Sequence, residues 1–274
     1  MIEIVAPGPF ACLQDAGRSG YAALGVPRSG AFDRGALRLA NLLVGNRPGA
    51  AAVELTLGAM TLVAHDAVTL TLAGAACPGD LSWGVPATVP AGTRLQIGVP
   101  ASGVRSYLAV RGGVATAAVL GSCSTDTLSG LGPAPLRAGD RLYPGREQVG
   151  DVSSASAAQR ARRERVRVVP GPREDWFVPD AFTTLTRARW TVRADSNRVG
   201  VRLDGPPLAR RTSAELPSEA TLPGAVQVPP DGRPIVLGPD GPVTGGYPVI
   251  AVLREADLDV LAQLRPGDTV GFSA

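Results

Sequence analysis

Apolar and polar residues alternate with a period of two along several parts of the chain. The alternation is clearest over residues 67–74 and 93–99, and a further β-like run over residues 105–113 ends on a pair of glycines. Because successive side chains of a β-strand point to opposite faces, this period predicts half-buried strands. Strands of this kind, separated by short turns, are predicted to make up most of the fold.

Two segments follow a helical spacing instead. Over residues 33–44 apolar residues recur on one face, with Asp33 placed to cap the first turn and Gly45 to end the last. Residues 255–264 are predicted to form a second helix. Short strands with one helix per lobe favour closed β-barrels, which have no exposed edge strands. We therefore predict a mainly β fold of two β-barrel lobes with a few short helices.

Composition and two short repeats predict that there are two lobes. The 274 residues are 45% hydrophobic, enough for two modest cores, and 34 Gly and 25 Pro disfavour a helical bundle. The sequence "VAPGP" near the N-terminus is echoed by "VVPGP", and "LRAGDRL" by "LRPGDTV", which suggests duplication of one β-rich unit. The lobes are predicted over residues 1–148 and 166–274, with a linker over 149–165.

The predicted linker overlaps the strongest cluster of charge in the chain. The segment "QRARRERVRV", residues 159–168, follows a small polar stretch without apolar periodicity. A solvated linker is the simplest interpretation, and a phosphate-binding patch is the alternative. The net charge of +3 is mild for this length, so nucleic acid is not expected as a partner.

Residue types that are absent or rare exclude several kinds of chemistry. The chain contains no lysine, so it cannot hold a P-loop lysine, a Schiff base or an attached biotin. His65 is the only histidine, which excludes a metal site with two histidines; we expect it in a turn between strands, with a catalytic role as the alternative. Three widely spaced cysteines fit reduced thiols. Without a basic leader or a long apolar run, the protein is predicted to be cytoplasmic, with no membrane partner.

Residues 13–46 carry more polar side chains than a core requires. Asp15 and Arg18 are predicted to form an ion pair that braces a glycine turn. Ser29 and Asp33 stand at a helix entry, where free backbone N–H groups favour a carboxylate or a phosphate. The alternative is that both residues merely cap the helix.

Polar residues elsewhere allow more than one interpretation. Asn41 and Glu54 lie in apolar surroundings, where an unpaired polar group would cost about 1–3 kcal/mol, so both are expected to have a polar partner. The segment 120–132 can wrap a small polar ligand or form a long turn. Arg198 suits bidentate recognition of a carboxylate, or a brace between loops.

Several long blocks, taken in order, resemble one known family. They are "QDAGRSGYAALGVPRSGAFDRGALRLANLLVGN", "VELTLG", "YLAVRGGV", "LGSCSTD", "LRAGDRL", "SNRVGVRLDG", "AVQVPPDGRPIVL", "TGGYPVIAVL" and "LAQLRPGDTV". In these blocks the chain resembles the 5-oxoprolinase C-subunit family, also called the allophanate hydrolase subunit 2 or biotin-dependent carboxyltransferase-like family. The resemblance runs from near residue 5 to the C-terminus.

The resemblance implies two cyclophilin-like β-barrel lobes and a chain that is inactive alone. With homologues of the B and A subunits of that enzyme, it would cleave 5-oxo-L-proline to L-glutamate at the expense of ATP. ATP and Mg would then be bound by the complex. The alternatives are a carboxyltransferase subunit of the allophanate hydrolase or urea carboxylase type, and a regulatory binding module.

The implied chemistry needs cations for phosphate and a carboxylate to steer water. The candidates for these catalytic roles are Arg18, Asp33, Arg198 and Glu219. The candidates for binding the amide substrate are Asp15, Ser29, Asn41, Gln227, Thr244 and Tyr247, and no metal ligand is expected. All are predicted to converge on one cleft.

The C-terminal half carries the densest group of these residues. The family's "SEG…GAIQVPP…TTGGYP" region corresponds to residues 218–248, and the polar residues that match it are Ser218, Glu219, Gln227, Asp240, Thr244 and Tyr247. Pro242 and Val243 depart from the family pattern, which has a Gln-Thr pair there. Two hydrogen-bonding side chains are therefore missing beside Thr244.

Overall fold

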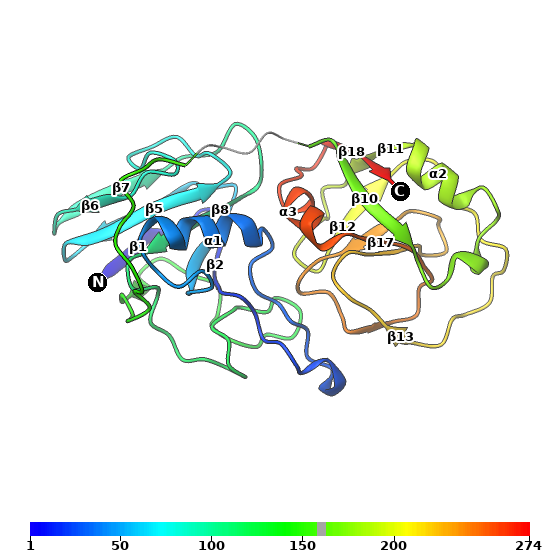
Figure 1. The fold of residues 1–274 in the computed structure, drawn as a ribbon, viewed down its shortest axis with the longest axis horizontal. Coiled ribbons are helices and arrows are strands. Elements are labelled where there is room, and N and C mark those ends of the chain that lie inside the picture. Colours follow the sequence, from blue (N-terminus) through cyan, green and yellow to red (C-terminus); the bar gives the residue numbers. More distant parts are fainter. Residues whose placement is uncertain (158–162) are drawn as a thin grey trace. The chain divides into compact units, whose positions relative to one another are not determined.

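The computed structural model describes residues 1–157 and 163–274, which form two compact units (Figure 1). Unit 1 contains residues 1–18, residues 33–126 and the stretch from residue 130 to the gap at 158–162. Unit 2 contains residues 19–32, residues 127–129 and the stretch from the gap to residue 274. Two short segments of the N-terminal half therefore fold with the C-terminal half. Part of the predicted linker and of its arginine cluster falls on 158–162, outside the described residues.

Unit 1 consists of two antiparallel sheets and one helix. The first sheet has the strand order β7-β4-β1-β9, with β1 Ile2–Ala6, β4 Met60–Ala64, β7 Thr93–Ile97 and β9 Arg141–Leu142. The second has the order β2-β3-β8-β5-β6, with β2 Phe10–Gln14, β3 Ala52–Thr56, β5 Val68–Gly74, β6 Ala87–Val89 and β8 Arg105–Val110. Their apolar faces share one core, in which Ile4 and Leu62 of the first sheet pack with Leu72 and Leu108 of the second.

The predicted strands are present, but two of them are more buried than predicted. In β7 exposed and buried residues alternate as expected for a half-buried strand. In β8, by contrast, all six residues are buried, and in β5 five of seven are. The reason is that helix α1, Arg34–Leu43, packs on β5 and β8 and covers the face that would otherwise meet water.

Unit 2 is a closed barrel with the strand order β10-β17-β14-β15-β12-β11-β18. The strands are β10 Arg165–Pro170, β11 Arg189–Val192, β12 Gly200–Asp204, β14 Ala225–Gln227, β15 Ile235–Leu237, β17 Val249–Leu253 and β18 Thr269–Ser273. A separate two-stranded sheet pairs β13, Glu219–Ala220, with β16, Thr244–Gly245. The barrel interior is filled by apolar side chains, the largest of which is Trp190. Phe32, from one of the two N-terminal segments, belongs to the same core.

The mainly β class with few short helices is confirmed, since the part of the chain that the structure describes places 33% of residues in strands and 11% in helices. Helix α1 matches the prediction for 33–44, and the Asp33 side chain accepts a hydrogen bond from the Ala36 N–H as a cap. The helix predicted over 255–264 is shorter: a 3₁₀ turn, Glu255–Asp257, leads into α3, Leu258–Leu261. His65 follows β4 in a turn and lies 3.0 Å from Glu3, as expected for a residue between strands.

Three further short helices were not predicted. They are α2, Ala181–Arg187, and the 3₁₀ turns Ala22–Leu24 and Glu174–Trp176. Helix α2 contains three threonines, which have low helix propensity because their branched side chains lose rotamer freedom. Its formation depends on burying Ala181 and Leu185 against the barrel. No helix in the part of the chain that the structure describes is long and apolar enough to cross a membrane.

The entry to α1 depends on a buried tyrosine in unit 1. The hydroxyl of Tyr107 accepts a hydrogen bond from the Asp33 N–H at 2.9 Å and donates one to a carboxylate oxygen of Glu54 at 2.6 Å. Burial, together with the negative charges of Glu54 and Asp33, raises the pKa of Tyr107 well above its ordinary value. The hydroxyl therefore stays protonated and able to donate. The partner expected for Glu54 is this hydroxyl, with Arg105 at 3.5 Å.

We predict that Tyr107→Phe lowers the free energy of unfolding by about 1–3 kcal/mol, because it leaves the buried Glu54 carboxylate without its hydroxyl donor. Urea unfolding measures the change. Tyr143→Phe is the matched control, since that side chain is 53% exposed, and it should change the stability by less than about 0.5 kcal/mol. Equal effects of the two substitutions would contradict a role for the Tyr107 hydroxyl.

Candidate functional site

Asp15 and Arg18 hold one loop of unit 1 rather than each other. Asp15 accepts hydrogen bonds from the hydroxyls of Ser122 and Ser124, at 2.7 and 2.5 Å, and from the Cys123 N–H at 2.6 Å. Arg18, only 2% exposed, donates to the carbonyl of Ser124 at 2.5 Å. Both residues lie in the described part of the chain and no ion pair joins them, so the predicted pair is wrong. Within the segment 120–132, residues 122–124 therefore form a turn that is braced by Asp15 and Arg18.

The other two unit 1 candidates, Asp33 and Asn41, have local structural partners. Asp33 caps α1, which supports the capping interpretation of this position. The Asn41 amide, fully buried in α1, donates to the carbonyl of Ala50 at 2.8 Å and accepts from the side chain of Asn46 at 3.0 Å. Asn41 therefore joins its helix to the turn that follows it, and its predicted role in substrate binding stays a prediction.

Ser29 and Arg198 meet in unit 2 at a third residue, Asp240. The Ser29 hydroxyl donates to Asp240 at 2.6 Å, and the Arg198 guanidinium donates to both carboxylate oxygens at 2.8 and 2.9 Å. Thr127 adds its N–H at 3.0 Å and its hydroxyl at 2.7 Å. Arg198 also donates to the carbonyl of Gly30 at 2.6 Å. We call this group of Ser29, Thr127, Arg198 and Asp240 the Asp240 clamp.

The clamp is almost entirely buried, and its charges are balanced. Burial by itself would raise the pKa of Asp240, but the charge of Arg198 and the hydrogen bonds of the clamp outweigh it and lower the pKa below the ordinary value. Ser29 adopts a backbone φ of 53°, in the left-handed region that is unfavourable for a residue with a Cβ. The predicted carboxylate partner of Arg198 is thus an internal one, which supports the brace interpretation.

The remaining candidates gather at one corner of unit 2, formed by residues 215–232 and 242–248. Strands β13 and β16 place Glu219 opposite Gly245 and Ala220 opposite Thr244. The side-chain amide of Gln227 donates to the carbonyl of Tyr247 at 3.4 Å. The motif that singled out this stretch in the sequence therefore corresponds to residues that are neighbours in space, and we call it the unit 2 corner.

Glu219 forms a bidentate ion pair with Arg173, a residue that the sequence did not single out. Arg173 donates through Nε to one carboxylate oxygen at 2.9 Å and through Nη2 to the other. This hydrogen bonding and charge lower the pKa of Glu219. A carboxylate held ionised in this way is a weak proton acceptor, and it is better suited to orienting a neighbouring donor.

The departure from the family motif at Pro242 and Val243 has a structural explanation. The hydroxyl of Thr221 donates to the carbonyl of Pro242, and the Thr221 N–H donates to the carbonyl of Val243 at 2.8 Å. Both positions thus contribute backbone acceptors that extend the pairing of β13 with β16 by one residue beyond Ala220. These contacts do not require the side chains of the family's Gln-Thr pair.

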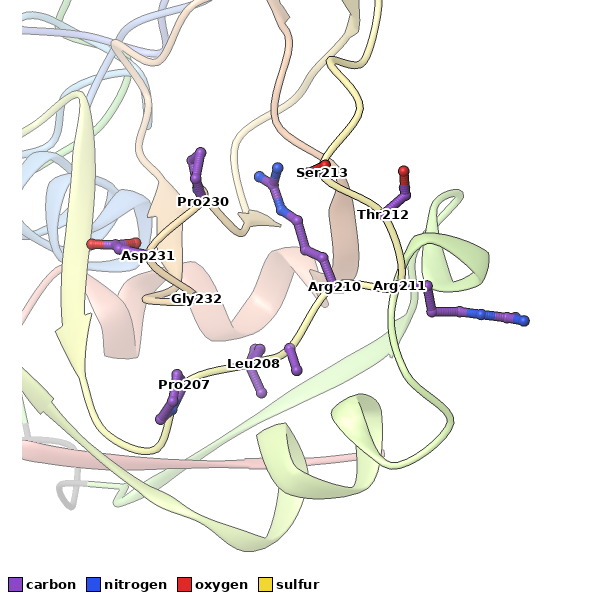
Figure 2. A pocket seen from close by; sticks show the side chains of 10 residues that line it. Pro207, Leu208, Arg210, Arg211, Thr212, Ser213, Pro230, Asp231 and Gly232 are labelled. Carbon is purple, nitrogen blue, oxygen red and sulfur yellow. The ribbon is translucent and has the colours of Figure 1, made fainter.

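A pocket of about 370 Å³ lies next to the unit 2 corner, and Figure 2 shows its lining. It is formed by two loops, and the lining residues are Pro207, Leu208, Ala209, Arg210, Arg211, Thr212, Ser213, Pro230, Asp231 and Gly232. Arg210 donates to the carbonyl of Val228, the residue after Gln227. The sequence analysis missed this pocket; two adjacent arginines in a loop without periodicity were the available signal. Over residues 1–157 and 163–274, no group of three His, Cys, Asp or Glu side chains is arranged to hold a metal ion.

Comparison with known proteins places the chain in a family. The family model described as "Carboxyltransferase domain, subdomain A and B" matches residues 24–274. The chain belongs to this carboxyltransferase-domain family. The match covers nearly all of unit 2, including its corner and the pocket, and most of unit 1.

Three relatives show the range of the carboxyltransferase-domain family. The C subunit of 5-oxoprolinase from Escherichia coli (strain K12) is 41% identical, over 99% of this chain and 90% of its own length. Urea amidolyase of Saccharomyces cerevisiae is 35% identical over 99% of this chain, which corresponds to only 16% of that protein. The crystal structure of TTHA0988 superimposes with a TM-score of 0.89 and 37% identity, covering all of this chain and 55% of that chain. Members of the family thus occur both as separate subunits and as parts of longer proteins.

We predict that Asp240→Asn lowers the free energy of unfolding by about 3–5 kcal/mol at neutral pH, because it removes the carboxylate charge that pairs with the buried Arg198 cation. The exposed pair of Asp204 and Arg233 supplies the control: Asp204→Asn should cost about 0–1 kcal/mol.

The difference in stability between the wild type and Asp240→Asn is expected to depend on pH. The folded-state pKa of Asp240 lies below its ordinary value of 3.8, so the clamp's electrostatic stabilisation is complete above that pH and is lost as the pH falls through the folded-state pKa. Urea unfolding of the wild type and Asp240→Asn should therefore converge in strong acid. A difference that stays constant at every pH would contradict an ionised Asp240.

Proposed function

We propose that this chain is the C subunit of an ATP-dependent 5-oxoprolinase, which opens 5-oxo-L-proline to L-glutamate together with its A and B subunits. The observation that carries the proposal is the 41% identity to a protein named as the C subunit of 5-oxoprolinase, which extends over nearly the whole of both chains. A second relative of the same name, from Haemophilus influenzae, is 35% identical over the full chain.

The chemistry explains why ATP is needed. Amide resonance protects the lactam, so the amide oxygen first takes the γ-phosphoryl group of ATP and ADP leaves. Water then adds to the activated carbon, the ring C–N bond breaks as the nitrogen takes a proton, and an acyl phosphate remains. A second water releases phosphate and glutamate. These steps need cations for the phosphoryl oxygens and a carboxylate that orients water.

The unit 2 corner is the part of this chain best suited to contribute to such a site. It brings Glu219, Gln227 and Tyr247 together next to a pocket that contains Arg210. Arg18, Asp33 and Arg198, by contrast, are engaged in braces within their own units, so we assign them positioning roles. Mg²⁺ would accompany ATP, and both would be held by the assembled complex.

The alternative function is carboxyl transfer of the urea amidolyase type, which the family description and the 35% identity to the yeast enzyme favour. Because the chain contains no lysine, biotin would have to arrive attached to another protein. The two functions differ in substrate: one consumes 5-oxo-L-proline, and the other consumes urea and bicarbonate.

The decisive assay measures ATP-dependent glutamate formation by the purified complex of this chain with its A and B partners. We expect the three chains to elute together in size-exclusion chromatography and to form glutamate, and we expect none when this chain is omitted or assayed alone. ATP hydrolysis that depends on urea and bicarbonate, without glutamate formation from 5-oxo-L-proline, would instead identify a carboxyltransferase.

We predict that Glu219→Gln lowers turnover of the assembled complex at least about tenfold, because the neutral amide can no longer orient a donor as the Arg173-held carboxylate does. The control is Glu164→Gln, which removes a comparable but exposed ion pair with Arg189 in the same unit and should leave turnover within about twofold. If Glu219→Gln keeps full turnover in the assembled complex, Glu219 is only a brace of the β13–β16 sheet.

A further inference from the structure

The pocket beside the unit 2 corner has walls fixed by backbone hydrogen bonds. The first of its two loops contains residues 207–213. On one side of this loop, the Val178 N–H donates to the carbonyl of Ala209 at 3.2 Å. On the other, the Leu208 N–H donates to the carbonyl of Gly232 at 2.9 Å. Gly232 has a φ of 76°, and a Cβ on it would lie 2.9 Å from the Cβ of Pro207, so only glycine fits at this contact. The two loops are therefore held together with the pocket between them.

Arg210 is the charged group that this pocket presents. In Figure 2 its side chain extends between Pro230 and Ser213, whereas Arg211 extends away from the other lining residues. One guanidinium nitrogen of Arg210 donates to the carbonyl of Val228. Its Nε is buried and, among the residues that the structure describes, has no hydrogen-bond partner.

The positive charge of Arg210 has no counter-charge in ion-pair contact among the described residues. Two other arginines of unit 2 have one: Arg198 pairs with Asp240, and Arg173 with Glu219. Asp231 also lines the pocket, but it extends to the side opposite Arg210, and one of its oxygens accepts the Arg233 N–H at 3.0 Å. Burial lowers the pKa of Arg210, and the charges of Tyr247 and Asp231 only partly oppose this. The cation is thus partly desolvated without a partner that compensates for it.

A planar, partly desolvated guanidinium matches the two oxygens of a carboxylate or phosphate better than any neutral ligand. We propose that this pocket is an oxyanion subsite in which Arg210 binds a small anionic ligand. Thr212 and Ser213 also line the pocket, and each carries a hydroxyl that can donate a further hydrogen bond. Only the identity of the anion rests on the proposed function. That function offers two candidate anions: the carboxylate of 5-oxo-L-proline or L-glutamate, and the phosphate groups of ATP.

The test is equilibrium binding to the full chain by isothermal titration calorimetry, without its partners. The ligands are 5-oxo-L-proline, 2-pyrrolidinone as the same lactam without a carboxylate, inorganic phosphate and ATP. We expect at least one anion to bind, Arg210→Gln to weaken that binding at least about tenfold, and Arg211→Gln to change it less than about twofold. Binding of 5-oxo-L-proline but not of 2-pyrrolidinone assigns the site to the carboxylate, whereas binding of phosphate and ATP alone assigns it to the phosphoryl groups.

Three results would overturn the subsite. They are absence of binding of every anion, equal binding by wild type and Arg210→Gln, or binding of both 2-pyrrolidinone and 5-oxo-L-proline with equal affinity. If Arg210→Gln does not fold, the wild-type chain still gives an answer through phenylglyoxal, which modifies accessible arginines. The bound anion should then protect Arg210, and not Arg211, from modification as measured by mass spectrometry, and equal protection or none counts against the site.

Failure of the anion-binding test can be told apart from failure of the proposed function. The binding measurement needs no partner and no turnover, so an Arg210-dependent anion site stands even if the complex forms no glutamate. Conversely, a complex that turns over normally while Arg210→Gln binds every ligand as the wild type does would refute the subsite alone.

Discussion

The buried carboxylate of Asp240 is the interaction on which unit 2 depends most. It accepts hydrogen bonds from Ser29, Thr127 and Arg198, which belong to three segments far apart in the sequence; Ser29 is 211 residues away. A buried charge is costly unless it is paired and fully hydrogen-bonded, and here both conditions are met. The clamp therefore secures residues 19–32 and 127–129 to the barrel of unit 2, with Phe32 in the barrel core beside them.

Local features of the fold could be predicted from the sequence, because they depend on neighbouring residues. The period of two identified β5 and β7, a β-like run ending on two glycines identified β8, and the capping residue Asp33 identified the start of α1. Helix α2 could not be predicted, because its threonines disfavour a helix and its stability comes from packing on the barrel. Nor could the full burial of β8, since it results from the position of α1 on the sheet.

The same distinction applies to the candidate site. The unit 2 corner was indicated by one continuous stretch of sequence, and Glu219, Gln227, Thr244 and Tyr247 are neighbours there because that stretch folds back on itself through β13 and β16. Convergence of the unit 1 candidates with this corner on one cleft stays a prediction. The partners that decide what each polar residue does were not predictable: Asp240 for Ser29, Arg173 for Glu219 and the serines of residues 122–124 for Asp15 are all long-range contacts. Arg210 escaped notice because what sets it apart is the absence of an acidic partner among the described residues.

The carboxyltransferase-domain family includes relatives named as a 5-oxoprolinase subunit and as urea amidolyase, so membership of the family does not by itself fix the reaction. The measurement that tests the role of Arg210 most directly is a pair of crystal structures of this chain, one grown with 5-oxo-L-proline and one with phosphate. In at least one of them the unit 2 pocket should hold the anion, with its oxygens on the guanidinium of Arg210. A pocket filled by solvent in both structures would contradict this role.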